Sequence, residues 1–206
     1  MASNREILTE RGEAAYALGM QTLGLYRQWS HTEMTTRLPH SGMSPGESTR
    51  FLSPYVVIPH LVAIAEDFVR SLLIESVETQ LPLEPEVVWT FWRLVEQDIE
   101  GGWSQVFEAL NEWYGINCKA APSFQKLQGF IEARNAIVHG LGNLTRKQTR
   151  TARAERRSRS MLQTAGVPIV GQRVTPNDST VYSCATTVAE FVSWVDVASQ
   201  AALKVS

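Results

Sequence analysis

The spacing of apolar side chains restricts this chain to a mainly helical fold. Over most of its length, apolar residues recur every three to four positions, which is the period of one face of an α-helix. Each of the clearest stretches holds enough apolar positions to bury one such face against neighbouring helices. We therefore predict helices over residues 5–29, 53–79, 84–100, 103–114, 123–139 and 186–205.

Local signals separate these helices. Residues 31–50 turn polar and include two prolines and two glycines, so we expect a loop there. Two alternating apolar runs, 167–174 and 179–183, flank the turn-forming residues 175–178, which predicts a β-hairpin over 167–184. The expected fold class is all-α. It is an up-and-down helical bundle in a single domain of 206 residues, with a small β-hairpin before the C-terminal helix.

The composition is that of a globular protein and excludes several classes. The chain is 44% hydrophobic with a formal net charge of −2, and no apolar run approaches the ~20 residues that a membrane-spanning helix needs. Its first residues carry charges every few positions, unlike a secretory signal. The two cysteines, Cys118 and Cys184, lack the companions of a zinc site and fit a reducing compartment. We expect a cytoplasmic protein with no membrane association, metal or cofactor.

Positive charge is concentrated in one segment. Residues 146–159 contain seven basic residues and one acid. Because phosphate groups attract such charge, the segment is a candidate RNA contact, led by Arg146, Lys147 and Arg150. The other interpretation is a solvated, flexible connection, since charge runs are usually exposed. On either interpretation, residues 146–166 form a basic insertion before the hairpin.

The most informative stretch lies at the end of the helix predicted over 123–139. It contains Arg134, Asn135 and His139, followed by Gly140. On a helix that turns about 100° per residue, Asn135 and His139 are four positions apart and lie on one face. Arg134 is roughly 140° around the helix from His139, but its long side chain can bend toward that edge.

These residue types suit the cleavage of RNA. The reaction needs a group that takes the proton from a ribose 2′-hydroxyl, a group that protonates the leaving 5′-oxygen, and a cation near the phosphate. Histidine transfers protons near neutral pH, and arginine binds phosphate oxygens through its fork of N–H donors. Asn135 would orient the histidine or hold a phosphate oxygen. One Arg–His pair is a small set for this task, and two copies in a symmetric dimer would complete it.

The arrangement resembles the RxxxxH motif of the HEPN family (higher eukaryote and prokaryote nucleotide-binding proteins). The resemblance covers roughly residues 55–205 and includes the upstream helix from Trp103 to Tyr114, residues 142–145, and the hairpin before the last helix. It implies a ribonuclease without metal, in which paired domains share one cleft. Arg134 and His139 would be catalytic, with Asn135 as their polar partner.

The resemblance also implies a biological setting. HEPN proteins often act as toxins or in defence against phage, so an antitoxin or another defence protein is an expected partner. Some HEPN toxins are silenced by modification of a tyrosine two residues after the motif histidine. Leu141 stands at that position here, so the match for that control is absent.

A carboxylate on the helix predicted over 53–79 is a second candidate. Val62, Val69 and Leu73 share the helical stripe of Glu66, which directs its carboxylate toward an apolar interface. A buried carboxylate needs a partner, and we nominate Arg134. HEPN-like proteins often carry an acid in the corresponding helix. The alternative is a partly exposed glutamate at the edge of the stripe.

Three functional hypotheses follow. The first is a homodimeric endoribonuclease that leaves a 2′,3′-cyclic phosphate. The second is a non-catalytic HEPN module that binds RNA or protein in a defence system. The third is a structural helical dimer, in which Arg134 pairs with a neighbouring helix and His139 caps its own. Burial of both side chains within one protomer, remote from any cleft, would support the third.

Overall fold

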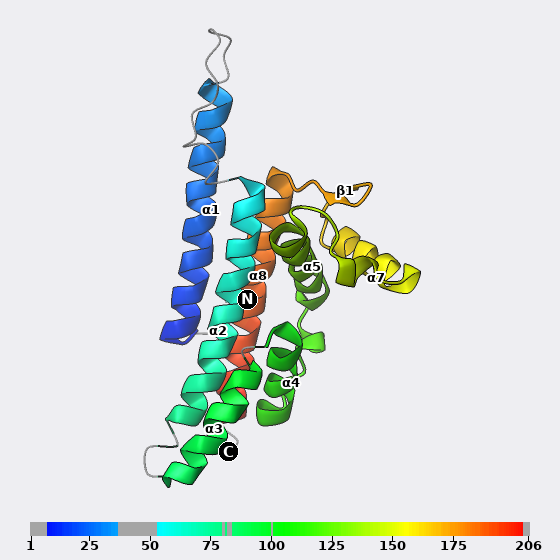
Figure 1. Cartoon of the computed structure of the whole chain (residues 1–206). Coiled ribbons are helices and arrows are strands. Elements are labelled where there is room, and N and C mark those ends of the chain that lie inside the picture. The colour runs from blue at the N-terminus through cyan, green and yellow to red at the C-terminus, as the bar shows by residue number, and fades with distance from the viewer. Residues whose placement is uncertain (1–7, 37–52, 80, 82–83, 100, 204–206) are drawn as a thin grey trace.

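The computed structural model describes residues 8–36, 53–79, 81, 84–99 and 101–203 (Figure 1). The prediction of an all-α bundle with a small hairpin before the last helix is confirmed. In chain order, the elements are α1 (Glu10–Thr36), α2 (Pro54–Glu78), α3 (Glu86–Ile99), α4 (Trp103–Tyr114), the 3-10 turn η2 (Cys118–Ala120), α5 (Phe124–Gly140), α6 (Arg146–Thr149), α7 (Ala152–Thr164), β1 (Ile169–Val170), β2 (Arg173–Val174) and α8 (Asp178–Leu203).

The centre of the bundle is the pair α2 and α8. α1 lies along one side of this pair and α5 along the other (Figure 1). α2 is apolar over most of its length, and Leu61, Val62 and Leu73 are fully enclosed, as are Phe191 and Val192 of α8. Burying each such apolar side chain contributes about 1.5–3 kcal/mol. All five belong to one hydrophobic cluster that also includes residues of α1, α4, α5 and α7.

The start of α1 is attached to a buried carboxylate in α8. Asp196 is fully enclosed and accepts hydrogen bonds from the backbone N–H of Thr9 (2.7 Å), the Thr9 hydroxyl (2.5 Å) and the side-chain amide of Gln200 (3.0 Å). Gly12 leaves the space for this carboxylate, because a Cβ built there would lie 2.6 Å from its Cγ. The Thr9 hydroxyl also accepts a hydrogen bond from the N–H of Gly12 (3.1 Å), so Thr9 caps α1 while Asp196 ties it to the last helix.

α1 extends beyond the expected start of the loop. Residues 31–36 are helical, so the predicted loop over 31–50 is wrong for its first six residues. Polar residues alone do not end a helix, and the first strong breaker in this stretch is Pro39. Residues 37–52 and the predicted helix start at residues 5–7 lie outside the described residues.

The β-hairpin is shorter than predicted and lies earlier. β1 and β2 pair antiparallel, and Gly171, with a φ of 61°, turns the chain between them. The predicted second strand over 179–183 is wrong, because these residues form the first turns of α8. Asn177 caps that helix, and its side-chain oxygen accepts a hydrogen bond from the N–H of Thr180 (3.0 Å). The residues expected to turn a hairpin therefore begin the last helix.

The basic segment is helical and packed. It forms α6 and most of α7, and α7 lies against α5. The close approach depends on Gly129 of α5, where a Cβ would lie 2.2 Å from the carbonyl oxygen of Met161 and 2.5 Å from Cβ of Ala165. Leu162 on the inner side of α7 is fully enclosed. Packing of the apolar side of α7 thus orders this segment, although its charged side chains by themselves favour exposure to solvent.

Candidate active site

α5 ends in a backbone turn that the hairpin holds. Leu141 has a φ of 51° and Gly142 a φ of 89°, and the N–H of Gly142 donates to the carbonyl oxygen of Ala136 (3.0 Å). The carbonyl of Gly142 in turn accepts from the N–H of Val174 in β2 (2.9 Å). The last two turns of α5, which carry the motif, are therefore fixed against the hairpin.

The three motif side chains lie together at this end of α5. Nη1 of Arg134 is 3.1 Å from Nε2 of His139 and 3.2 Å from Oδ1 of Asn135. The guanidinium therefore bends across the helix surface toward the imidazole, as the length of the arginine side chain allows. Asn135 contacts the arginine, and this contact holds the guanidinium beside the histidine.

The contact between Arg134 and His139 defines a form of the imidazole. A guanidinium has only N–H donors, so Nε2 of His139 is the acceptor when the two groups are hydrogen-bonded. The ring is then neutral and carries its proton on Nδ1. A neutral imidazole with an accepting nitrogen is the form that takes a proton from a hydroxyl group.

The motif is open to solvent. His139 is exposed, and Arg134 and Asn135 are half-buried. Enclosure of Arg134 and His139 within one protomer would support the interpretation as an ion pair and helix cap, and the exposed His139 does not give that support. The cap position of α5 is occupied by Leu141, and Arg134 contacts its own helix. A ligand can therefore reach both the guanidinium and the imidazole.

Glu66 belongs to a different contact. Its carboxylate forms an ion pair of 2.7 Å with Arg70, one turn later on α2, and most of its side chain is buried. The predicted pairing of Glu66 with Arg134 is therefore wrong. Carboxylate and guanidinium groups four residues apart on a helix pair without help from the tertiary structure. The spacing of Glu66 and Arg70 in the sequence was the signal for this pair.

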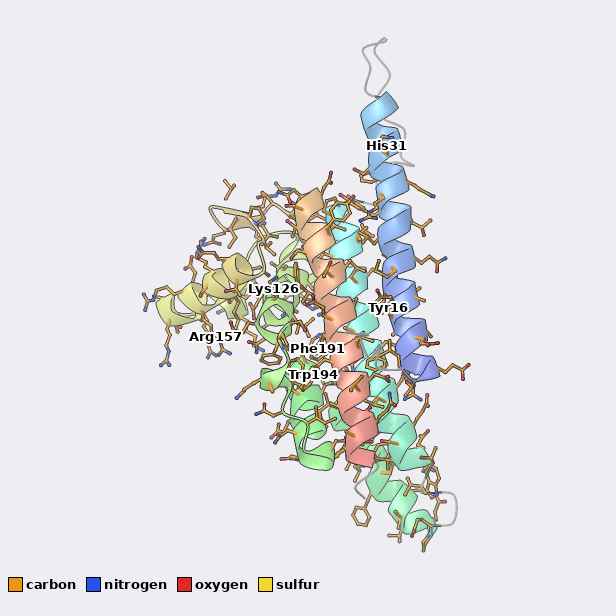
Figure 2. All side chains as sticks on the ribbon, turned by 180° about the vertical axis from the view of Figure 1, so that it is seen from behind. Tyr16, His31, Lys126, Arg157, Phe191 and Trp194 are labelled. Atoms are coloured by element: carbon orange, nitrogen blue, oxygen red, sulfur yellow. The ribbon has the colours of Figure 1, made fainter. Side chains whose placement is uncertain are left out.

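Basic side chains extend from the motif along α6 and α7. α6 is held to α5 by Gln148, whose side-chain amide donates to the carbonyl (3.0 Å) and carboxylate (2.6 Å) of Glu132. Arg146, Lys147 and Arg150 are exposed around this anchor. Figure 2 shows Arg157 on α7, at the edge of the molecule. Three further exposed arginines thus continue the positive surface: Arg153, Arg156 and Arg157.

The hairpin contributes two residues that no sequence pattern had marked. Arg173 is exposed and forms a β-bridge with Asn143, so it adds a cation close to the end of α5. Val170 on the same hairpin is 70% exposed, and Leu141 at the end of α5 is 87% exposed. The signal for their position was Gly171, which favours a two-residue turn between Val170 and Arg173.

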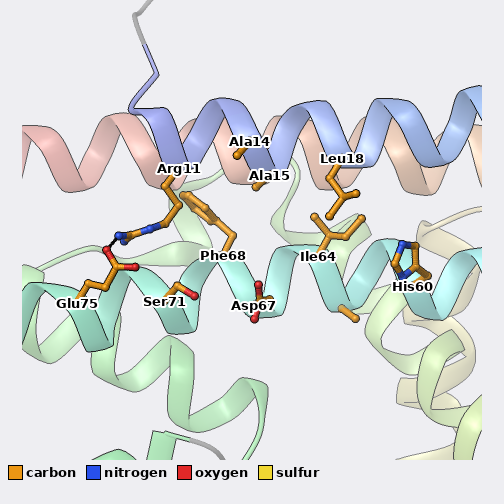
Figure 3. A pocket seen from close by; sticks show the side chains of 11 residues that line it. Arg11, Ala14, Ala15, Leu18, His60, Ile64, Asp67, Phe68, Ser71 and Glu75 are labelled. Atoms are coloured by element: carbon orange, nitrogen blue, oxygen red, sulfur yellow. Dashed lines mark ion pairs between the residues drawn. The ribbon is translucent and has the colours of Figure 1, made fainter.

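A groove of about 610 Å³ lies between α1 and α2 (Figure 3). The ion pair of Arg11 with Glu75 stands at one end of the groove and His60 at the other, and apolar side chains lie between them together with Asp67 and Ser71. None of the three motif residues lines it. The motif therefore lies on the surface, outside this groove.

Neither the thiols nor the metal-ligating side chains of the described residues form a further site. Cys118 and Cys184 are buried free thiols. Burial raises the pKa of Cys118 to about 12, and it also raises the pKa of Cys184. Both are therefore neutral near pH 7 and act as core side chains. Within the described ranges, no three His, Cys, Asp or Glu side chains gather to hold a metal ion, and no helix is long and apolar enough to cross a bilayer.

The chain was compared with protein-family models, with curated proteins and with solved structures, and nothing matches in any of the three comparisons. The features that bear on function are therefore the motif at the end of α5 and the charges around it.

Proposed function

We propose that this protein is an endoribonuclease of the HEPN type that cleaves RNA without a metal ion and acts as a homodimer. The observation that carries the proposal is the contact of 3.1 Å between Arg134 and His139 at a solvent-exposed helix end. It joins a permanent cation, which binds phosphate, to a group that transfers protons near neutral pH. Such a pair suits the chemistry of RNA cleavage.

Each side chain has a role in this reaction. Nε2 of His139 accepts the proton of the ribose 2′-hydroxyl, and the 2′-oxygen attacks the adjacent phosphorus. The bond from phosphorus to the 5′-oxygen breaks, and a second imidazolium protonates that oxygen. The products are a 2′,3′-cyclic phosphate and a 5′-hydroxyl. Arg134 stabilises the charge that develops on the phosphate oxygens, and Asn135 orients Arg134 through their contact of 3.2 Å.

The reaction needs two proton-transferring groups, and each chain supplies one motif histidine. A second copy related by two-fold symmetry supplies the other. The surface around the motif supports such a contact because it exposes Val138, Leu141 and Val170. Exposed apolar side chains that cluster beside a site mark an interaction surface.

The positive surface of α6 and α7 supports RNA as the substrate. Arg146, Lys147 and Arg150 lie directly after the motif helix, where they would contact phosphates that flank the cleaved bond. The likeness of the motif to HEPN proteins supports a role in the cytoplasm as a toxin or in phage defence, with an antitoxin or defence protein as partner.

The test is cleavage of labelled RNA by purified protein in EDTA. We expect wild-type protein to leave 2′,3′-cyclic phosphate ends, and His139→Ala to be slower by about 10²–10⁴-fold, as for loss of a proton-transfer group. The matched control is His60→Ala, which removes another exposed histidine that lies in the groove between α1 and α2. Equal cleavage by wild type and His139→Ala would overturn the proposal.

A second experiment tests the dimer. Val138→Asp places a charge in the exposed apolar surface beside the motif, and we expect it to lower both the dimer fraction and the cleavage rate. Leu25→Asp on α1 is the control, because Leu25 is 50% exposed and Val138 is 46% exposed. A Val138→Asp protein that remains as active as wild type would contradict the shared site.

The second candidate function is a non-catalytic module that binds RNA or protein. The exposed cations of α6 and α7 favour it, because they would bind RNA without any help from His139. RNA affinity that persists in every preparation, with no cleavage by wild type, would select this function over the first.

A further inference from the structure

A second exposed apolar surface lies on α3. Val87, Phe91 and Leu94 are 58%, 65% and 59% exposed, and Val95 is also exposed. Their spacing of three and four residues places them on one helix face, here named the α3 stripe. Trp92 lies on another face and is buried, with its ring 6.0 Å from that of Trp113 in α4. α3 is therefore attached through Trp92 and presents the α3 stripe to solvent.

The α3 stripe holds more exposed apolar side chains than an ordinary protein surface shows on one helix face. Single exposed apolar residues are normal on a protein surface. Four large ones on one helix face mark a place where another molecule binds. α3 lies at the end of the bundle away from the hairpin, so an occupant there leaves the motif of α5 open (Figure 1).

The surroundings of the α3 stripe are strongly acidic. Residues 75–114 contain nine acidic residues and one basic residue, so this part of the chain carries a net charge of −8 while the whole chain carries −2. The single base, Arg93, pairs with Glu86 at 3.4 Å. Among the described residues, no ion pair neutralises Glu84 and Glu96 at α3 or Glu108 and Glu112 of α4.

We infer that the α3 stripe docks a basic amphipathic helix of a partner protein. The apolar face of such a helix would cover Val87, Phe91 and Leu94, as amphipathic helices do in hydrophobic grooves and faces. Lysine and arginine residues at its borders would pair with the surrounding glutamates. The acidic residues around the α3 stripe define the charge of the partner. The helical spacing of the residues in the stripe defines the shape of the partner.

The same charges argue against other occupants. A second α3 would bring the acids of two copies together, and like charges across an interface disfavour association. RNA is repelled for the same reason. α7 of a second copy has the right charge, but its exposed residues are arginine, polar or small, and its leucine, Leu162, is enclosed. It therefore has no apolar face for the α3 stripe.

The test uses full-length protein and a fluorescent synthetic helix of about 18 residues, or five turns, built from leucine and lysine with one apolar face. We expect binding, measured by fluorescence anisotropy, and weaker binding on addition of salt. Phe91→Ser and Leu94→Ser should each weaken it by about tenfold or more, the factor that burial of one such side chain provides. Leu25→Ser on α1, which is 50% exposed, should bind like wild type.

Two control peptides and two further measurements define failure. A peptide with glutamate in place of lysine, and a lysine peptide whose leucines do not form one face, should both bind at least about tenfold more weakly. Equal binding of these controls, or no effect of Phe91→Ser and Leu94→Ser, would overturn the inference. A dimer that Phe91→Ser dissociates would assign the α3 stripe to a second copy. Binding to neutral lipid vesicles that Phe91→Ser abolishes would assign it to a membrane.

Discussion

Gly129→Ala is the sharpest test of how the basic segment is positioned. An alanine Cβ at this place in α5 would lie 2.2 Å from the carbonyl oxygen of Met161 and 2.5 Å from Cβ of Ala165. Both distances are far below van der Waals contact, and the first involves backbone that no change of rotamer moves. α7 must therefore separate from α5, which loosens the packing of Leu162.

The size of the effect follows from two opposing terms. Overpacking of this kind costs about 1–3 kcal/mol, and a backbone obstacle places Gly129→Ala near the upper end. Alanine regains about 1 kcal/mol over glycine in a helix interior. We expect a net destabilisation of about 2 kcal/mol, which for a chain of this size lowers Tm by roughly 4–8 °C.

The control is the same substitution at Gly24 in α1. A Cβ there would meet nothing within 4 Å, so only the gain in helix propensity remains. Gly24→Ala should raise Tm by roughly 2–4 °C. Thermal unfolding followed by circular dichroism measures both variants. A Gly129→Ala protein that melts at or above the wild-type temperature would refute the close packing of α5 and α7.

Three further predictions concern the tether of α1, the cations and a buried thiol. Asp196→Ala removes the acceptor of the Thr9 hydrogen bonds and should lower the free energy of unfolding, measured by urea titration, by about 1–2 kcal/mol, whereas Glu190→Ala on the exposed side of α8 should not. Arg150→Ala should reduce the slope of log K against log salt for single-stranded RNA by about 0.7, and an unchanged slope would remove it from the interface. Because burial raises the pKa of Cys118 from 9.0 to about 12, its thiol should react with a disulfide reagent at pH 8 only after unfolding. The pKa of the Cys118 thiol is higher in the folded than in the unfolded protein. Its contribution to the free energy of unfolding is therefore fully present below pH 9 and falls as the pH rises from 9 toward 12. Rapid labelling of the native protein, or a free energy of unfolding that stays constant from pH 9 to pH 12, would contradict this prediction.

The positions of the helices along the chain follow from local properties of the sequence. The period of apolar residues depends only on the geometry of the helix, so the ranges predicted for α2 and α4 agree with the structure to within a residue or two. The motif was also visible locally, because Asn135 and His139 are four residues apart and Arg134 has a long side chain. Their proximity is a property of one helix.

Tertiary structure decided the rest. An alternating run such as 179–183 suits a strand or a buried helix equally, and the helix forms because Asn177 caps it and α8 packs along α2 and α1. The basic segment is ordered because α7 packs closely against α5. Gly129 allows this close contact, although it lies far from α7 along the chain. Exposure is likewise a property of the whole fold. No local pattern reveals that His139 faces solvent or that the α3 stripe is uncovered. Burial depends on which other helices pack against a given helix face.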